Sequence, residues 1–193
     1  MSHRGLPRWA PAGAAVCVLA LAALPASAND ASVLQDKMRA ALRSAKSFVL
    51  TEEVKPGTMG APTGGTIVYT VVAPNRYHQV VTGSIGADDT IIIGNQIYGQ
   101  KNGGWTVQTW DDHLVSGFES DTFLVDVTSV DGANFVMSFP HEGPVKQTLS
   151  CTYDPQTFRP QKCVGEHVTL TYSQYDDPTL TIPTPANAKR EGS

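Results

Sequence analysis

The most constraining feature of this sequence is a run of short strand patterns that are separated only by tight turns. GTIVYTVVAPNRYHQVV, residues 65–81, is typical of two strands around a Pro-Asn turn. The pattern of residues 89–109 divides at Gly94-Asn95 and again at Asn102-Gly103, which is a strong hairpin signal. Because no helical pattern intervenes, this region predicts an antiparallel meander.

Several strand patterns carry apolar side chains on both faces. In the first hairpin, Ile67, Tyr69 and Val71 line one face. Val68 and Val72 lie on the other face, where a one-sided sheet would carry charge. The patterns with this property are 67–72, 91–93 and 164–172. Since hairpins exclude a parallel sheet between helices, we expect a strongly curved antiparallel sheet that is covered on its concave side.

One helix is predicted over residues 30–46, where Leu34, Met38, Ala41, Leu42 and Ala45 recur at helical spacing. A strand, residues 47–54, follows at once. Further strands are expected at 134–139, 146–153, 162–172 and 178–185, the last as an edge strand that prolines end. Residues 110–130 fit either state, and we expect one or two short lid helices there. The predicted fold class is therefore mainly β, a curved half-barrel with helices on its concave side.

The first 28 residues predict a secretory signal peptide. A basic head with Arg4 and Arg8 precedes an apolar run at 12–24 and a small-x-small site at 26–28. An uncleaved anchor is the alternative, but the apolar run is shorter than the roughly 20 residues that span a bilayer. We expect export to the periplasm, cleavage after Ala28, and a single domain over residues 29–190.

Two cysteines, Cys151 and Cys163, remain after the predicted cleavage. Their midpoint, Thr157, lies in the turn-rich stretch DPQTFRP, so a hairpin there would bring them opposite one another. In an exported protein this predicts a disulfide. A redox-active pair is the alternative, but it usually needs Cys-x-x-Cys at the start of a helix.

Charge and motifs exclude several classes of function. Without the signal the chain has 12 basic and 18 acidic residues, a net charge of −6, which argues against nucleic acid and anionic membrane partners. No G-x-S-x-G, H-E-x-x-H or Gly-rich phosphate loop is present. Glu52 and Glu53 alternate across a strand, so they do not form a carboxylate pair. We expect neither an enzyme nor a cofactor.

A metal site is the sharper interpretation of Asp111 to His113, with Asp88 and Asp89 as further ligands if the fold brings them near. Helix capping and turn formation explain these residues more simply. The other histidines, His78, His141 and His167, have no ligand-like spacing and fit ordinary surface or half-buried positions. We expect no metal.

The order of short motifs resembles a known family. SAKSFVLTEEV, VVAPNRY, IIIGNQIYGQKNGGW and LTIPTP follow an N-terminal amphipathic helix. This arrangement is similar to the lipoprotein-carrier superfamily of LolA, LolB and mycobacterial lipid carriers, and is closer to secreted relatives than to the carrier itself. The resemblance implies an incomplete barrel with a helical lid over an apolar cavity that binds acyl chains without chemistry. Ala73 stands where the carrier has a basic residue that holds the lid.

We therefore expect a monomeric exported protein that binds a lipid, an acyl chain or another apolar ligand in a concave sheet. The alternative is an envelope protein-interaction or stress-sensing module with a packed core, in which an edge strand at 178–182 recruits a protein partner. Plain core is the competing interpretation for each cavity candidate. The cavity candidates are Tyr69, Tyr77, Ile92, Tyr98, Trp105 and Phe123.

Overall fold

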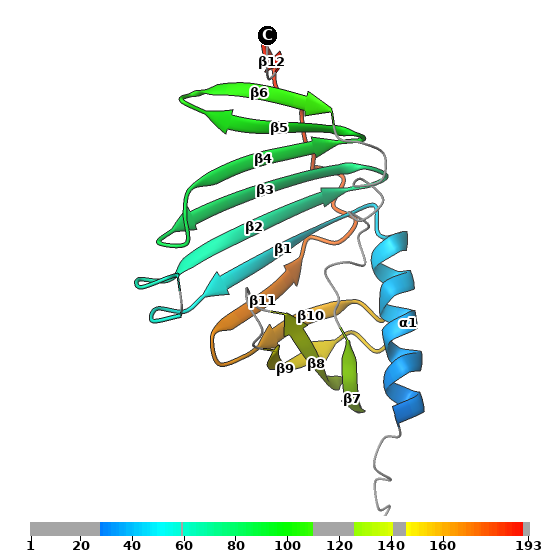
Figure 1. Cartoon of the computed structure of the whole chain (residues 1–193). Coiled ribbons are helices and arrows are strands. Elements are labelled where there is room, and N and C mark those ends of the chain that lie inside the picture. Colours follow the sequence, from blue (N-terminus) through cyan, green and yellow to red (C-terminus); the bar gives the residue numbers. More distant parts are fainter. Residues whose placement is uncertain (1–27, 59, 110–125, 141–145, 191–193) are drawn as a thin grey trace, which may run out of the picture.

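The structure is a computed structural model that describes residues 28–58, 60–109, 126–140 and 146–190. In this part of the chain one helix precedes twelve strands (Figure 1). The elements are α1 (Ala28–Ser44), β1 (Ser47–Val54), β2 (Gly65–Val72), β3 (Arg76–Gly83), β4 (Asp88–Ile93), β5 (Gln96–Lys101), β6 (Gly104–Thr109), β7 (Val127–Asp131), β8 (Asn134–Pro140), β9 (Lys146–Tyr153), β10 (Pro160–Val164), β11 (Val168–Ser173) and β12 (Lys189–Arg190).

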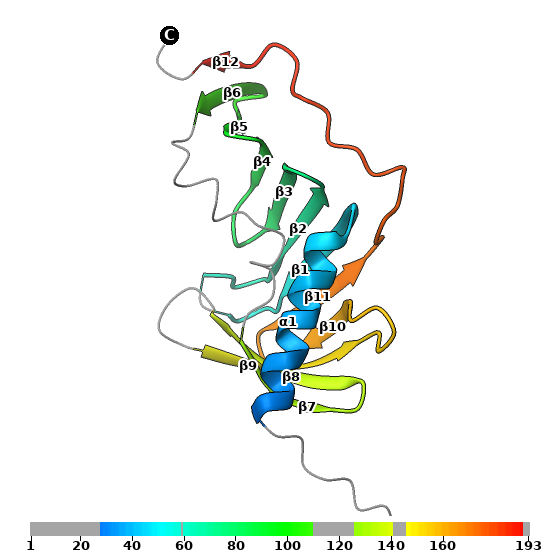
Figure 2. The ribbon, with the colours of Figure 1, turned by 90° about the vertical axis from the view of Figure 1, so that its right-hand side faces the viewer.

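All twelve strands belong to one open, curved sheet. Its order is β12-β6-β5-β4-β3-β2-β1-β11-β10-β9-β8-β7, and every pairing is antiparallel except that of β12 with β6. Two meanders, β2 to β6 and β7 to β11, are joined where β1 pairs with both β2 and β11. Figures 1 and 2 show the sheet bending around the side on which α1 lies. The expected mainly β, half-barrel fold class is confirmed.

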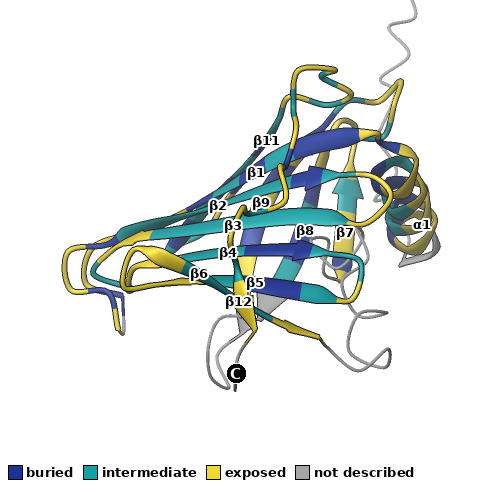
Figure 3. Ribbon diagram, turned by 90° about the horizontal axis from the view of Figure 1, so that it is seen from above, coloured by how far each residue is buried: buried dark blue, intermediate teal, exposed yellow. Residues whose placement is uncertain are grey.

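The helix packs one apolar stripe on the sheet. Leu34, Met38 and Leu42 are buried against inward side chains of β1, β2 and β7 to β11. We name this group the main core cluster, and its buried members are Ala31, Leu34, Met38, Leu42, Ala45, Phe48, Leu50, Val71, Val127, Phe135, Met137, Leu149, Cys151, Tyr153, Cys163, Val168, Leu170 and Tyr172. Figure 3 shows the opposite side of α1 exposed. Only Ala45 and Lys46 separate α1 from β1, so the chain turns sharply, and the Lys46 amide donates a 2.7 Å hydrogen bond to Asp176 at that turn. The helix was expected at 30–46 and begins and ends two residues earlier.

The predicted disulfide is confirmed. Cys151 of β9 and Cys163 of β10 are directly opposite in the antiparallel register and are bonded. The hairpin between them contains Thr157, as expected, and its register shifts between Pro160 and Lys162. This bulge sets Cys163 on the same face as Cys151.

The single strand expected at 162–172 is wrong, because the chain reverses within it. β10 ends at Val164, and the Gly165 amide donates a 2.8 Å hydrogen bond to the Val168 carbonyl across the turn to β11. Val164 is 44% exposed on the outer face, whereas Leu170 and its alternate neighbours are buried inward. These apolar residues belong to two strands, so this stretch is not apolar on both faces.

The edge strand expected at 178–185 is also wrong. This segment contains no strand, and the chain pairs with the sheet only at β12, in parallel with β6. Pro178, Pro183 and Pro185 lack the amide hydrogens that a ladder of strand hydrogen bonds requires. Residues 174–190, named here the C-terminal strap, instead run along the outer side of the sheet (Figure 2).

The ambiguous segment 110–130 is partly described. Residues 127–130 lie in β7, so a helix is wrong there. Val127 is buried and Val130 is half-buried against the main core cluster. In a regular strand, residues three apart point to opposite faces, but the register of β7 shifts between Val127 and Ser129, so both can face inward. Residues 110–125, with Asp111, His113 and Phe123, lie outside the described residues, as does His141.

The strap covers the second apolar face that the sequence predicted. Ile91 and Tyr98 of the outer face are buried together with Ile182 of the strap, and this group is named here the outer cluster. The Arg76 guanidinium donates a 2.7 Å hydrogen bond to the Ile182 carbonyl and fixes the strap above the sheet. Half-buried side chains complete the outer cluster: Val72, Ile93, Trp105, Val107 and Ala188.

Replacing Ile182 with Ala should destabilise the protein by about 2 kcal/mol or more, because it removes a buried anchor and leaves a cavity. Urea unfolding followed by tryptophan fluorescence measures the free energy of unfolding. Thr181→Ala, at the adjacent exposed position, is the control and should change that free energy by less than about 0.5 kcal/mol. Equal effects of the two substitutions would mean that the strap does not pack through Ile182.

Candidate ligand site on the inward face

The strand register defines one continuous inward face. Val71, Tyr77, Ile92 and Ile97 are cross-strand partners from β2 to β5, so their side chains share a face. The same pairing joins Val71 to Phe48, which lies in the core under α1. The inward strip, as we use the name below, consists of Ile67, Tyr69, Tyr77, Val81, Ile92 and Ile97.

The inward strip continues the core but is less completely covered. Tyr69 and Tyr77 are half-buried and pack against the main core cluster. Ile92 and Ile97 form a buried cross-strand pair, whereas Ile67 and Val81 are half-buried. Among the described residues, the fully buried members of the main core cluster include none from β3 to β6. The core under α1 therefore ends at the border of this strip.

A buried carboxylate interrupts the apolar inward face. Glu52 is only 8% exposed, and it pairs across the sheet with Ile67 of β2 and Leu170 of β11. Burial, together with the negative charge of Glu52, raises the pKa of Tyr69 to about 12. The same two causes raise the pKa of Tyr172. Both hydroxyls therefore keep their protons above the ordinary tyrosine pKa. A mostly apolar face with few polar groups is the usual composition of a ligand site.

The structure divides the six candidate cavity residues. Tyr69, Tyr77 and Ile92 come together on the inward strip. Tyr98 and Trp105 lie in the outer cluster under the strap, because Tyr98 adjoins inward-facing Ile97 and successive strand residues point to opposite faces. Phe123 lies outside the described residues. A role of these six residues in ligand binding stays a prediction.

Glu52 was missed as a site residue, although the sequence contains a signal for it. Inward positions of β1 alternate as Phe48, Leu50, Glu52 and Val54, so one charge falls in an otherwise apolar series. Glu53 is exposed on the other face, which confirms that the two carboxylates do not face one another. A charged residue at an inward position of a two-sided apolar sheet is the pattern to look for.

In the described ranges, no three or more His, Cys, Asp or Glu side chains are grouped as metal ligands. Asp89 Oδ1 lies 2.7 Å from His78 Nε2 on the outer face, and Asp88 accepts a hydrogen bond from Thr90. His78 is half-buried, as expected. Both aspartates lie in β4 and make these contacts with residues of β3 and β4.

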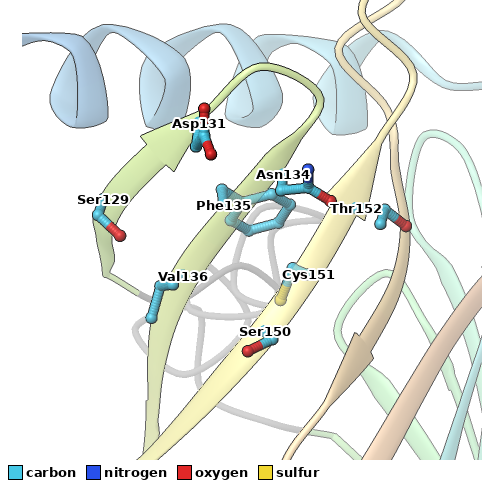
Figure 4. A pocket seen from close by; sticks show the side chains of 8 residues that line it. All are labelled: Ser129, Asp131, Asn134, Phe135, Val136, Ser150, Cys151 and Thr152. Atoms are coloured by element: carbon cyan, nitrogen blue, oxygen red, sulfur yellow. The ribbon is translucent and has the colours of Figure 1, made fainter. Parts of the chain in front are cut away.

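Two surface hollows lie away from the inward strip. One, of about 410 Å³, lies over β7, β8 and β9, and Figure 4 shows the side chains that line it. The other, of about 470 Å³, lies where the β1–β2 connection meets the end of β3, before the β3–β4 connection. The first is lined by Ser129, Asp131, Asn134, Phe135, Val136, Ser150, Cys151 and Thr152. Its lining mixes polar side chains with Phe135, Val136 and Cys151, whereas the inward strip is apolar throughout.

Comparison with solved structures finds LprF from Mycobacterium bovis, with a TM-score of 0.53 and 13% identity over 83% of this chain and 99% of that one. A weaker similarity is to the lipoprotein LppX of Mycobacterium tuberculosis, with a TM-score of 0.47 and 12% identity over 77% of this chain and 98% of that one. Another is to a LolA superfamily protein from Nitrosomonas europaea, with a TM-score of 0.35 and 8% identity over 82% of this chain and 96% of that one. No family model and no curated protein matches the sequence. The expected LolA-like fold is confirmed.

Within the described residues, no helix has both the length and the apolar character that crossing a bilayer requires.

The buried tyrosines should make the protein sensitive to alkali. Above the ordinary tyrosine pKa of 10.0, the unfolded chain loses protons that folded Tyr69 keeps until about pH 12. The unfolded state then binds fewer protons than the folded state. The contribution of Tyr69 to the free energy of unfolding is therefore fully present below pH 10 and is lost as the pH rises from 10 to about 12. Urea unfolding at several pH values, with tyrosinate absorbance as the proton count, measures the fall.

Tyr69→Phe is the control for this pH dependence. It removes one late-titrating hydroxyl, so the fall in stability between pH 10 and 12 should become less steep. A fall of unchanged steepness in the Phe variant would exclude Tyr69 as a source.

Proposed function

We propose that the inward strip binds an apolar or amphipathic ligand, such as a lipid or an acyl chain. The observation that carries this proposal is the division of the inward face. The core under α1 draws its fully buried residues from β1, β2 and β7 to β11, whereas β2 to β5 present further apolar side chains beyond it. Four of the six side chains of the strip are half-buried, and Ile92 and Ile97 are buried beside them. An apolar chain can leave water against such a surface.

The expected energy is sufficient for useful affinity. Removing apolar area from water contributes roughly 25 cal/mol per Å², or about 0.8 kcal/mol per CH₂ group. A chain of about twelve carbons therefore gains roughly 10 kcal/mol before the costs of association, and more where the strip's own side chains lose contact with water. Micromolar binding needs about 8 kcal/mol after those costs, so a chain of at least this length is expected.

We infer the compartment and the role from the sequence. The protein is exported by the signal in residues 1–28, residues 29–190 form one monomeric domain, and the bound ligand is shielded during passage through the periplasm. No chemistry on the ligand is proposed. The alternative, a protein-interaction module, was argued from an edge strand at 178–182, and that segment is part of the strap rather than a strand.

Two adjacent residues of β2 provide a matched test. Ile67 and Val68 are both half-buried, but Ile67 points into the inward strip and Val68 to the outer face. Ile67→Trp should weaken binding of the apolar probe N-phenyl-1-naphthylamine about tenfold, since the indole takes the space of at least two chain carbons. Val68→Trp should leave probe binding unchanged. Fluorescence titration of the purified proteins measures both.

Native mass spectrometry of the periplasmic protein completes the test. Wild-type protein should carry lipid mass that Ile67→Trp loses and Val68→Trp keeps. Wild-type protein that neither carries lipid nor binds the probe would show that the inward strip is packed core, and the proposed function would be lost.

A further inference from the structure

The two flanks of α1 are in different surroundings. Lys37 Nζ lies 4.6 Å from the ring centre of Phe158, in the β9–β10 hairpin. On the opposite flank, Gln35 Oε1 accepts a 2.9 Å hydrogen bond from the Val127 amide at the start of β7. Arg39 lies one turn beyond Gln35, so it is on the Val127 flank and not on the hairpin flank.

Arg39 carries a donor that is unpaired in the described part of the chain. Its Nε atom is buried and has no hydrogen-bond partner among the described residues, although the side chain as a whole is half-buried. A buried donor on a charged group costs free energy when it is unpaired, so such atoms are rare in folded proteins. Gln35 Oε1, one turn away on the same flank, already accepts a hydrogen bond from the Val127 amide.

Arg39 is in the half of α1 that lies nearer to the inward strip. Figure 2 shows the C-terminal end of α1 beside β1 and β2, and its N-terminal end beside β7 and β8. Ala45, directly after the last residue of this half, is buried in the same core cluster as Phe48 and Val71. A ligand head held by Arg39 would therefore lie beside the half of α1 that is nearer to β1 and β2.

We propose that the inward strip takes an anionic amphiphile whose carboxylate or phosphate pairs with the Arg39 guanidinium while its acyl chain lies along the strip. This inference rests on the proposed function and narrows the class of ligand. The planar guanidinium presents donors in a fork that matches both anions, and Nε is one of the two donors on its side face. Glu52 lies farther along the inward face, where its negative charge disfavours an anion. The head therefore stays at the helix and the chain points away from it.

Three twelve-carbon probes test this inference: dodecanoate, dodecyl phosphate and the neutral dodecanol. Each competes with N-phenyl-1-naphthylamine for the purified full-length mature protein at pH 8 and low salt. Wild-type protein should bind at least one of the two anions about tenfold more tightly than the alcohol, as one charge-assisted pair allows. The anion that binds more tightly identifies a fatty acid or a phosphate head as the source.

Arg39→Gln should remove this preference, lowering the affinity for the anion about tenfold and leaving dodecanol binding unchanged. Lys37→Gln makes the same change of charge on the opposite flank of α1 and should keep the preference. Arg39→Lys retains the charge but loses Nε and the fork, so most of the preference should still be lost. Thermal unfolding confirms that each variant is folded. If one is not, the loss of anion preference in high salt, with dodecanol unaffected, tests the wild-type protein directly.

The failures can be told apart. Equal binding of all three probes to the wild-type protein, or a preference that Arg39→Gln keeps, would overturn the role of Arg39 and leave the proposed function standing. Absence of binding of every apolar probe to the wild-type protein would overturn both.

Discussion

The structure depends on one constraint, which is that β2 to β5 carry apolar side chains on both faces. Opposite ends of the chain cover the two faces of the sheet, and they do so to different extents. On the inward side α1 buries Met38 and Leu42 in a core over β1 and β7 to β11, which reaches β2 at Val71. On the outer side the strap buries Ile182 against Ile91 and Tyr98, and β12 occupies the edge next to β6. Covering the edge also removes a row of free backbone groups that could pair with another chain.

The two covers are unequal, and the candidate site follows from that difference. The outer cluster is small, and its side chains are matched by the strap in the same region of the sheet. The inward face spans the whole sheet, whereas the core beneath α1 takes its fully buried residues from β1, β2 and β7 to β11. The inward strip is the part of the inward face that lies beyond this core. Its half-buried tyrosines, Tyr69 and Tyr77, pack against the core.

Local chemistry made much of the fold predictable. The 47–54 strand, the turns at Gly94-Asn95 and Asn102-Gly103, and the disulfide depend on neighbours in sequence or on a single hairpin, and all are confirmed. The errors concern stretches whose state is decided by distant contacts. Residues 162–172 have apolar residues on both sides of Gly165-Glu166-His167, and the chain reverses there so that β11 pairs with both β10 and β1. The 178–185 segment has strand-like residues, but its place is set by packing on the outer face.

The candidate site was less predictable than the fold because strand parity decides which face a residue joins. Neighbours such as Ile97 and Tyr98 differ by one position and end on opposite sides of the sheet, so an aromatic residue alone does not indicate a cavity. Charge is more informative than size in this setting. An apolar side chain fits either face. Burying a charged group costs free energy, and both Glu52 and Arg39 Nε, which is unpaired among the described residues, are buried. The two groups have opposite charges and lie at different places along one apolar surface. They would therefore orient an amphiphile with one anionic end, because Arg39 attracts that end and Glu52 repels it.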